Sequence, residues 1–495
     1  MMFRSLIVGL ALVLPIASQQ IQDIWTTTSD KNSLFKYQNL GSDAIQFTND
    51  ASASANIKVE PNTTYQEMIG FGAALTDSTA QLLSQLKSSD SGKYWALLNY
   101  IFNSTDGAQS AGMTYLRIPI GSSDFSQTSY TYDDVDGDSQ LDHFDIDNAP
   151  AYLFDTLKDI QSINSVLKVH LCPWSAPAWM KESKTITGGK FASSYTKVYA
   201  QYLLKSLQAF QKMGVTAHAI SLQNEPQNSN PTYASALVDP SLEAKIGSEL
   251  RPLMDSAGFK DTVIVAYEHN WDDAGAYPVT VMDQAADSFA GAAFHCYGGD
   301  VGNQEQFHDK YPQKDIYFTE CTGSFNGDFW SDLQWYMNNI FIGSVNHHAK
   351  NAAMWNLVLD DKGEPLLNTT TSCRGSDPCR GVVTLKSDGS YVPNQEFYAI
   401  AQASKAVIPK DQNGPFGQRI SSSVSGSDDL VVTAYVTKRA ADAPSTAWPR
   451  YSLVVLNQRV SGATGWMIHE TDRVPQAEYK FPTGVTTLWW YAQSD

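Results

Sequence analysis

Residues 194–226 read SYTKVYAQYLLKSLQAFQKMGVTAHAISLQNEP and contain one complete unit of the predicted fold. Gly214 is a typical helix stop, and before it apolar side chains recur on one helical face, namely Tyr199, Leu203, Leu207 and Phe210. A short apolar strand follows at 217–224, and Glu225 is among the polar residues that end it. A helix followed by a buried strand is the repeating unit of an α/β protein.

The same alternation continues on both sides of this unit, from about residue 66 to about residue 408. A second amphipathic stretch follows Ser241 and stops at Gly258. The strand candidates are residues 67–73, 114–120, 167–173, 217–224, 262–268, 290–297, 315–321 and 352–358. Eight strands with helical or long connections between them predict a (β/α)8 barrel, the TIM-barrel fold of the α/β class.

A doubly wound open sheet is the main alternative to the barrel. Its usual signature is a glycine-rich phosphate-binding turn after the first strand. Residues 70–77, GFGAALTD, contain the first two glycines of that motif without the third, which is a weak match.

The composition is that of a folded acidic protein. The chain has 495 residues, of which 42% are hydrophobic and 17% charged, so a disordered chain is excluded. Lys and Arg number 34 against 52 Asp and Glu, and the net charge of −18 argues against a nucleic-acid partner. Aromatic residues reach 12%, and composition alone does not separate core packing from stacking on sugar rings.

The pattern changes after residue 408. Short strands are predicted at 430–435, 451–456 and 487–491, with Gly, Ser and Asp between them, and the N-terminal segment 26–61 is also non-helical. We therefore predict a barrel with an appended all-β sandwich domain built from both ends of the chain. The division is a signal peptide at 1–18, N-terminal sandwich strands at 19–65, the barrel at 66–408 and the C-terminal sandwich part at 409–495.

The first residues, MMFRSLIVGLALVLPIASQQ, have the layout of a secretory signal peptide. Arg4 precedes an apolar run at 6–14 that is too short to span a bilayer, although a buried N-terminal helix is an alternative. We predict a secreted, extracellular protein without membrane insertion. N-glycosylation sequons fit that location and occur at Asn62, Asn103 and Asn368.

The chain has five cysteines. Cys373 and Cys379 lie close together in the polar stretch SCRGSDPCRG, and we predict a local disulfide between them. Cys172, Cys296 and Cys321 each end an apolar run, and we interpret them as three buried thiols in preference to a metal site.

Two glutamates, Glu225 and Glu320, end the fourth and seventh predicted strands. Active residues of a β/α barrel lie at the carboxyl ends of its strands. Retaining glycoside hydrolysis needs two carboxyl groups about 5 to 5.5 Å apart, one protonated and one ionised. Either glutamate alone is most simply a loop carboxylate or a salt-bridge partner. Together, with Trp174, Trp271 and Trp355 at neighbouring strand ends, they favour a glycosidase site.

These strand ends belong to motifs that resemble glycoside hydrolase family 30, which includes lysosomal glucosylceramidase and the fungal β-1,6-glucanases. The motifs stand in family order and cover most of the chain after the leader. They are GFGAALTDS at 70–78, LRIPIGSSDFS at 116–126, PWSAPAWMK at 173–181, SLQNEP at 221–226, YFTECTG at 317–323, MWNLVLD at 354–360 and QEFYAIAQASKAV at 395–407. The stretches HCYGGDV at 295–301 and FTECTGSF at 318–325 look like the fungal endo-β-1,6-glucanase branch.

The resemblance implies a role for each matching residue. Glu225 corresponds to the general acid/base, Glu320 to the nucleophile, and Arg117 to a cation near that nucleophile, although Arg117 could equally pair a buried acid. The residues implied to bind substrate are Arg117, Asp124, Trp174, Asn224, Tyr297 and Trp355. No cofactor is predicted, and no metal, because His269 and His295 lack a recognisable third ligand and the chain has no HExxH motif.

The predicted function is a monomeric, secreted, retaining glycosidase that cleaves β-1,6-linked glucan. Enzymes of the same family that act on glucosylceramide, β-1,6-galactan or xylan are the alternatives. A catalytically silent protein that binds cell-wall glucan is the non-enzyme alternative, and the intact glutamate pair argues against it.

Overall fold

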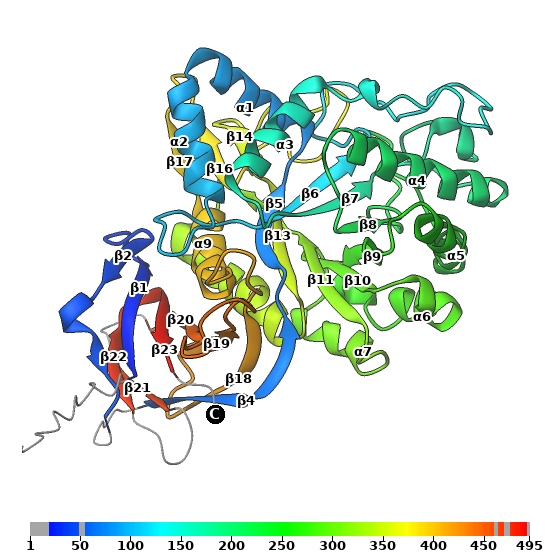
Figure 1. Cartoon of the computed structure of the whole chain (residues 1–495). Coiled ribbons are helices and arrows are strands. Elements are labelled where there is room, and N and C mark those ends of the chain that lie inside the picture. Colours follow the sequence, from blue (N-terminus) through cyan, green and yellow to red (C-terminus); the bar gives the residue numbers. More distant parts are fainter. Residues whose placement is uncertain (1–18, 49–54, 460–463, 470–475, 493–495) are drawn as a thin grey trace, which may run out of the picture.

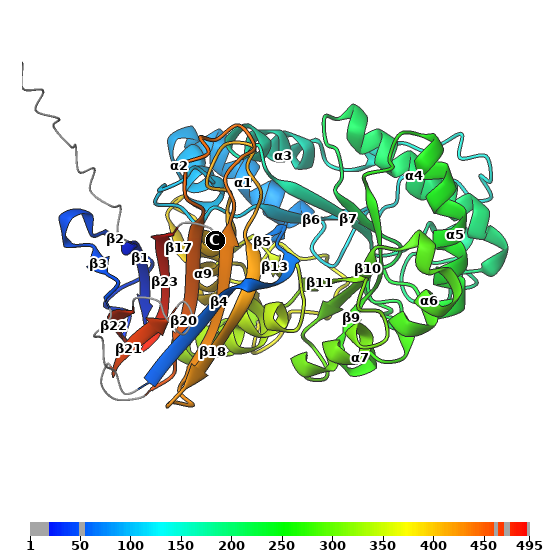
Figure 2. The same ribbon diagram turned by 60° about the horizontal axis from the view of Figure 1, so that its bottom comes forward.

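A computed structural model describes residues 19–48, 55–459, 464–469 and 476–492 of the chain. The predicted signal peptide at 1–18 lies outside the described residues. Figures 1 and 2 show a barrel surrounded by helices and, beside it, an antiparallel sheet domain. No helix in these ranges is long and apolar enough to cross a membrane.

The barrel is built from eight parallel strands in the order β11-β10-β9-β8-β7-β6-β5-β13. They are β5 (Gly70–Ala74), β6 (Tyr115–Ile120), β7 (Lys168–Pro173), β8 (Ala219–Ser221), β9 (Val263–Asn270), β10 (Gly291–His295), β11 (Asp315–Glu320) and β13 (Asn351–Asn356). A single parallel bridge between Ile316 and Ala349 spans the seam, so the barrel is nearly closed. The predicted barrel and its eight strands are confirmed, and the open doubly wound sheet is excluded.

Helices cover the outside of the barrel (Figure 1). They are α1 (Asp77–Ser89), α2 (Ser91–Phe102), α3 (Ala151–Ile163), α4 (Thr196–Lys212), α5 (Pro240–Ser256), α6 (Tyr277–Ala285), α7 (Gln304–His308), α8 (Phe329–Tyr336), a π-helical turn (Met337–Ser344) and α9 (Gln395–Val407). Helix α4 buries its predicted apolar face, and Asp239 caps the start of α5, where its side chain accepts a hydrogen bond from the Leu242 amide.

Inside the barrel, an apolar layer supports a polar one. Ala219, Val265, Ala293 and Tyr317 form a small buried cluster at the lower level. One step further toward the carboxyl ends, the inward positions are polar and equally buried, among them Arg117, Ser221, Glu268, His295 and Thr319. Short strands then shape the loops beyond the barrel, namely β12 (Gly323–Ser324), β14 (Val358–Asp360), β15 (Cys379–Arg380), β16 (Val383–Leu385) and β17 (Tyr391–Pro393).

The second domain is a mostly antiparallel sheet that combines both ends of the chain, with β21 parallel to β4. Its strands are β1 (Gln20–Thr28), β2 (Lys36–Asn39), β3 (Ile45–Gln46), β4 (Ala55–Glu67), β18 (Gln418–Ser425), β19 (Leu430–Thr437), β20 (Arg450–Asn457), β21 (Thr464–His469), β22 (Ala477–Phe481) and β23 (Gly484–Tyr491). Strand β1 pairs with β23, and a bridge between Thr48 and Gln476 brings the two ends of the sheet together around one apolar core. The predicted sandwich from N- and C-terminal segments is confirmed.

Helix α9 joins the two domains. All of its residues are buried, and Gln402 donates to Thr27 of β1 while accepting from Thr487 of β23. The indole of Trp489 donates to the Lys405 carbonyl at 2.8 Å and lies 4.3 Å from the Trp25 ring. Much of the aromatic excess therefore packs domain cores and their interface.

Two disulfides are present, and one of them corrects the prediction of three buried thiols. Cys373 and Cys379 are bonded as predicted, but Cys296 and Cys321 are also bonded, which leaves Cys172 as a buried thiol. Cys296 and Cys321 each follow the last residue of a barrel strand, and β10 and β11 are parallel neighbours with His295 opposite Glu320. The two cysteines are therefore level, with Cα atoms 5.3 Å apart.

Thiol titration of the denatured, unreduced protein should therefore detect one thiol, that of Cys172, and reduction should expose all five. A Cys172→Ala variant is the matched control and should give no signal before reduction. Three thiols in the unreduced protein would show that Cys296 and Cys321 are not bonded.

The predicted glycosylation sites differ in exposure. Asn62 and Asn368 are exposed, whereas Asn103 is half-buried, with its side-chain oxygen accepting from the Thr105 amide. Glycosylation at all three stays a prediction.

Candidate active site

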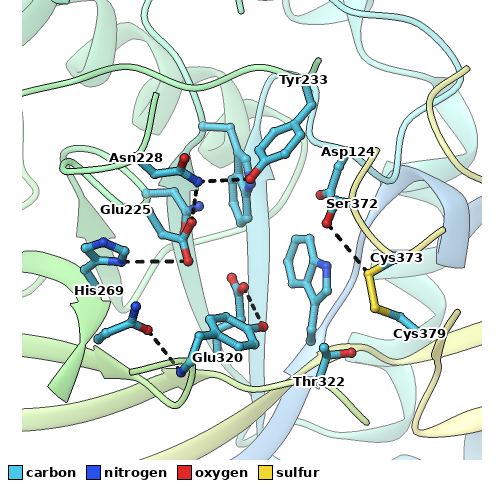
Figure 3. Close-up of a pocket in the computed structure, with 15 residues that line it drawn as sticks. Asp124, Glu225, Asn228, Tyr233, His269, Glu320, Thr322, Ser372, Cys373 and Cys379 are labelled. Carbon is cyan, nitrogen blue, oxygen red and sulfur yellow. Dashed lines mark hydrogen bonds and ion pairs between the residues drawn. A yellow bond between two sulfur atoms is a disulfide. The ribbon is translucent and has the colours of Figure 1, made fainter. Parts of the chain in front are cut away.

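A pocket of about 400 Å³ opens at the carboxyl ends of the barrel strands (Figure 3). Seven residues predicted to act in catalysis or substrate binding line it, namely Asp124, Trp174, Asn224, Glu225, Tyr297, Glu320 and Trp355. The eighth, Arg117, is fully buried beneath the pocket and contacts Glu320 and Asn224. The disulfide between Cys373 and Cys379 forms part of the wall.

Glu225 follows β8 in a strained backbone conformation. Its φ of 45° lies in the left-handed region that non-glycine residues rarely adopt, and such strain concentrates at functional sites. Its Oε2 accepts a hydrogen bond from Asn228 Nδ2 at 2.8 Å. Its Oε1 lies 3.3 Å from Nδ1 of His295 and 3.8 Å from Nδ1 of His269. The Glu225 carboxyl group therefore faces two imidazoles.

Glu320 is the last residue of β11 and has different neighbours. Nη1 of Arg117 donates to its Oε2 at 2.6 Å, and the Tyr297 hydroxyl donates to its Oε1 at 3.0 Å. Both oxygens thus accept from donors, which suits an ionised carboxylate. Its side chain remains 7% exposed, so one side of the carboxylate faces the pocket.

The electrostatics of the two carboxyl groups are linked through His295. Burial favours the neutral form of Glu225, but the hydrogen bond and charge of His295 outweigh it and lower the pKa of Glu225 to about 2. Burial raises the pKa of Glu320, and the charges of His295 and Arg117 oppose that rise. Burial likewise opposes a charge on His295, yet Glu320, Glu225 and Glu268 raise its pKa to about 9. The proton near Glu225 therefore resides on His295 in the free protein.

Aromatic rings form the opposite side of the pocket. Trp174 and Trp355 are stacked, with ring centroids 4.9 Å apart, and the guanidinium of Arg117 lies 4.7 Å from the Trp174 ring. Asp124 is buried next to them, and burial together with the charge of Glu320 raises its pKa to about 8. A carboxyl group that keeps its proton near neutral pH can donate a hydrogen bond to a sugar hydroxyl.

Several pocket residues were not among those predicted to act in catalysis or substrate binding. They are Asn228, Tyr233, His269, Asn270, Thr322 and Ser372. Most come from loops, where hydrophobic periodicity carries no signal, although Asn270 and His269 stand at the end of a predicted strand. Trp271, expected beside the glutamates, is instead buried against Phe318 with its indole donating to Gln304, so that expectation was wrong.

One cluster has the composition of a metal site. Glu225, His269 and His295 each bring a ligand atom within 4.8 Å of the others. Both ring nitrogens of His295, however, already contact carboxylate oxygens, those of Glu225 and Glu268. A metal ion at Nδ1 would have to displace the contact with Glu225. The predicted lack of a metal stays a prediction, and the cluster is hydrogen-bonded as it stands.

A nearly closed α/β barrel with paired glutamates, stacked tryptophans and a buried arginine at its strand ends defines a barrel glycosidase. The chain belongs to glycosyl hydrolase family 30, because the model of that family's TIM-barrel domain matches residues 68–407.

Individual proteins that are similar to this chain are consistent with the family assignment. The chain is 32% identical over 365 residues to the endo-1,6-beta-D-glucanase neg1 of Aspergillus fumigatus, and the aligned part covers 70% of this chain and 71% of that protein. It is 34% identical over 362 residues to an endo-1,6-beta-D-glucanase of Neurospora crassa, and the aligned part covers 70% of this chain and 71% of that protein. A solved endo-β1,6-glucanase structure superposes with a TM-score of 0.80 at 27% identity, covering 95% of this chain and 99% of that one.

Proposed function

We propose that this family 30 enzyme is a secreted, retaining glycosidase that cleaves β-1,6-linked glucan by double displacement. Glu225 acts as the acid/base and Glu320 as the nucleophile. The observation that carries the proposal is the asymmetry of the pair in one pocket. Glu320 receives hydrogen bonds from Arg117 and Tyr297, whereas Glu225 lies against His295, which holds a proton.

In the first step, the Glu320 carboxylate attacks the anomeric carbon while Glu225 delivers a proton to the glycosidic oxygen. The carbon–oxygen bond to the leaving sugar breaks and an ester bond to Glu320 forms. In the second step, Glu225 takes a proton from water, whose oxygen attacks the anomeric carbon. The ester bond then breaks, the Glu320 carboxylate is regenerated, and the product keeps the β configuration.

The other pocket residues suit recognition of a glucosyl unit. Asn224 is held by Arg117 at 2.7 Å and is assigned to the sugar 2-hydroxyl, a contact that strengthens in the transition state. Trp355 supplies the floor under the ring, while Asp124 and Trp174 reach its far hydroxyls. Relatives named endo-1,6-beta-D-glucanases support the β-1,6 linkage, and two disulfides support an oxidising, extracellular location.

A substrate panel tests this function. We expect rapid release of reducing sugar from pustulan, a linear β-1,6-glucan, and at least tenfold slower release from β-1,6-galactan, xylan and a glucosylceramide. Galactan misplaces one hydroxyl group, and a pocket group left unpaired costs about 1–3 kcal/mol. Xylan lacks the hydroxymethyl group, and glucosylceramide has a lipid where the glucan has its next sugar. Proton NMR of the pustulan digest should show the β-anomer first. Glucosylceramide as the fastest substrate would contradict the glucan assignment, and an initial α-anomer would contradict retention.

A silent glucan-binding protein is the remaining alternative. It would bind pustulan without releasing sugar, so the same panel excludes it once turnover is measured. A heat-denatured sample is the control for contaminating glycosidases.

A further inference from the structure

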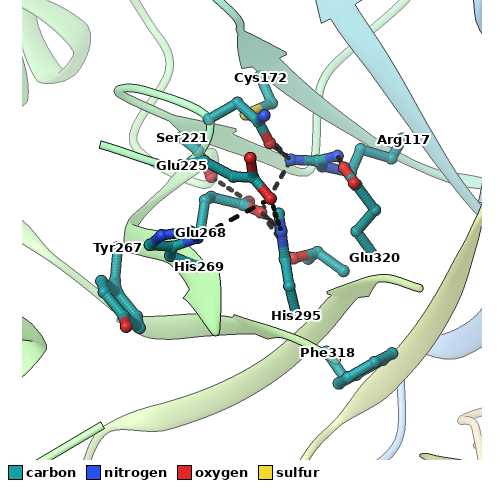
Figure 4. A network of polar contacts seen from close by, with 12 residues as sticks. Arg117, Cys172, Ser221, Glu225, Tyr267, Glu268, His269, His295, Phe318 and Glu320 are labelled. Carbon is teal, nitrogen blue, oxygen red and sulfur yellow. Dashed lines mark hydrogen bonds and ion pairs between the residues drawn. The ribbon is translucent and has the colours of Figure 1, made fainter. Parts of the chain in front are cut away.

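A third carboxylate, Glu268, lies buried directly beneath the two pocket glutamates (Figure 4). Its Oε2 accepts from Arg117 Nη2 at 3.0 Å and Thr319 Oγ1 at 2.6 Å, and lies 3.1 Å from His295 Nε2. Its Oε1 accepts from Ser221 Oγ at 2.5 Å. Glu268 thus contacts the partner of Glu320, which is Arg117, and the partner of Glu225, which is His295.

An irregularity in β9 turns this side chain inward. Tyr267 and Glu268 have φ values of 78° and 53°, and the pairing between β9 and β10 shifts register at this point. Val265 points into the barrel, so regular alternation would place Glu268 outside. Instead Tyr267 packs among outer aromatic residues and Glu268 joins the polar layer. The Glu225 amide donates to the Glu268 carbonyl at 3.0 Å, which ties the two strained positions together.

A directed chain of hydrogen bonds keeps Glu268 an acceptor. The Tyr115 hydroxyl lies 2.7 Å from His170 Nδ1, and His170 Nε2 lies 2.7 Å from the Ser221 hydroxyl. Burial lowers the pKa of His170 to about 4, so this imidazole is neutral and has one N–H. Tyr115 then donates to His170, His170 to Ser221, and Ser221 to Glu268. Burial opposes the charge of Glu268, but Arg117 and His295 hold its pKa well below its usual range.

An ionised Glu268 also decides which nitrogen of His295 carries a hydrogen. Nε2 faces Glu268, which can only accept, so Nε2 must donate. Nδ1 faces Glu225, and a proton there can lie on either the imidazole or the carboxyl group. We propose that Glu268 is a positioning residue that fixes His295 as an Nε2–H donor, so that one mobile proton is shared between His295 Nδ1 and Glu225 Oε1. This role rests on the proposed function of Glu225 as the acid/base.

The shared proton fits both steps of the reaction. Before catalysis it resides on His295, and Glu225 and Glu320 are both ionised. When Glu320 forms the ester bond it loses its negative charge, which is the strongest electrostatic support of the His295 proton. The proton therefore passes through Glu225 to the leaving oxygen as Glu320 attacks. Water returns a proton to the Glu225–His295 pair in the second step, and Glu320 regains its charge, so protons and bonds balance.

Titratable groups from all the strands around His295 influence the charge of its imidazole. The titratable groups that face it or its partners are Arg117 of β6, His170 and Cys172 of β7, Glu225 after β8, Glu268 and His269 of β9, Tyr297 after β10 and Glu320 of β11. Among the described side chains Arg117 is the permanent cation of this group, and it already binds Glu268 and Glu320. Of the remaining groups, His295 is the one whose positive charge is stabilised near neutral pH.

The test is the pH dependence of a Glu268→Gln variant. Gln keeps the shape but loses the charge, so the basic limb of kcat should move down by roughly one to two pH units. The loss of kcat on pustulan should therefore grow with pH, from almost none at pH 5 to about two- to tenfold at pH 8, with KM nearly unchanged. An unshifted basic limb, or an equal loss of kcat at every pH, would overturn the role.

Glu243→Gln is the matched control. Glu243 is another fully buried carboxyl group beside β9, but it accepts from the Tyr267 amide on the outer side of the barrel. Its replacement should leave the pH profile unchanged. If Glu268→Gln does not fold, ¹⁵N NMR of His295 in the wild type tests the role of Glu268. We expect Nε2 to carry a hydrogen at every pH, and an Nε2 without a hydrogen would overturn the role. A Glu320→Gln variant that kept turnover would instead refute the proposed function.

Discussion

Replacing Glu320 by Gln should lower kcat on pustulan by about 10⁴-fold or more, since the nucleophile of a two-step mechanism has no substitute in the pocket. An amide nitrogen cannot form the ester intermediate, and the remaining oxygen carries no charge. The fold should survive, because Arg117 retains its ion pair with Glu268 at 3.0 Å and Gln occupies the same volume. Initial rates together with thermal unfolding of the same sample measure both expectations.

A covalent trap makes the assignment of Glu320 specific. A 2-deoxy-2-fluoro glucoside with a good leaving group should inactivate the wild type by forming a stable ester, and mass spectrometry should place the label on the peptide that contains Glu320. The Glu243→Gln variant should be labelled like the wild type, because Glu243 lies outside the pocket. A label on a different residue would contradict the mechanism.

Replacing Glu225 by Ala should produce a loss that depends on the leaving group. We expect kcat on pustulan to fall by about 10²- to 10⁴-fold, the usual contribution of general acid–base catalysis. An aryl glucoside whose phenol leaves without protonation should form the intermediate at a nearly normal rate. Because deglycosylation then lacks its base, azide should enter the vacated space, restore turnover and give a β-glucosyl azide.

The comparison between the two substrates is the decisive measurement for Glu225. An equal loss on pustulan and on the aryl glucoside, with no rescue by azide, would mean that Glu225 supports structure instead of proton transfer. Asn228→Ala is a useful companion variant, because it removes the 2.8 Å hydrogen bond to Glu225 and leaves the carboxyl group in place. Its loss should be much smaller and insensitive to azide.

The barrel and its glutamate pair could be predicted because their signals are local. Helix α4 shows its apolar face in the residues 199–210 alone, and each barrel strand is a short apolar run that ends in polar residues. Strand ends of a parallel barrel must meet at one rim, so Glu225 and Glu320 are brought together by topology without further information. The change in pattern at both ends likewise predicted that N- and C-terminal segments share one domain, whereas the pairing of β1 with β23 was not predicted.

Local sequence patterns and the family resemblance therefore predicted the architecture and the meeting of two glutamates and two tryptophans at one rim of the barrel. The tertiary structure alone decided what depends on neighbours distant in the chain. Cys296 bonds to Cys321 because the register of β10 and β11 places the two residues side by side. Trp271 is buried in the core because it begins a helical turn directly after β9. Glu268 reaches the polar layer because an irregular backbone reverses the alternation of β9. Periodicity specifies which face of an element is apolar, but register and strain are set by packing, and they determine which polar groups share a proton.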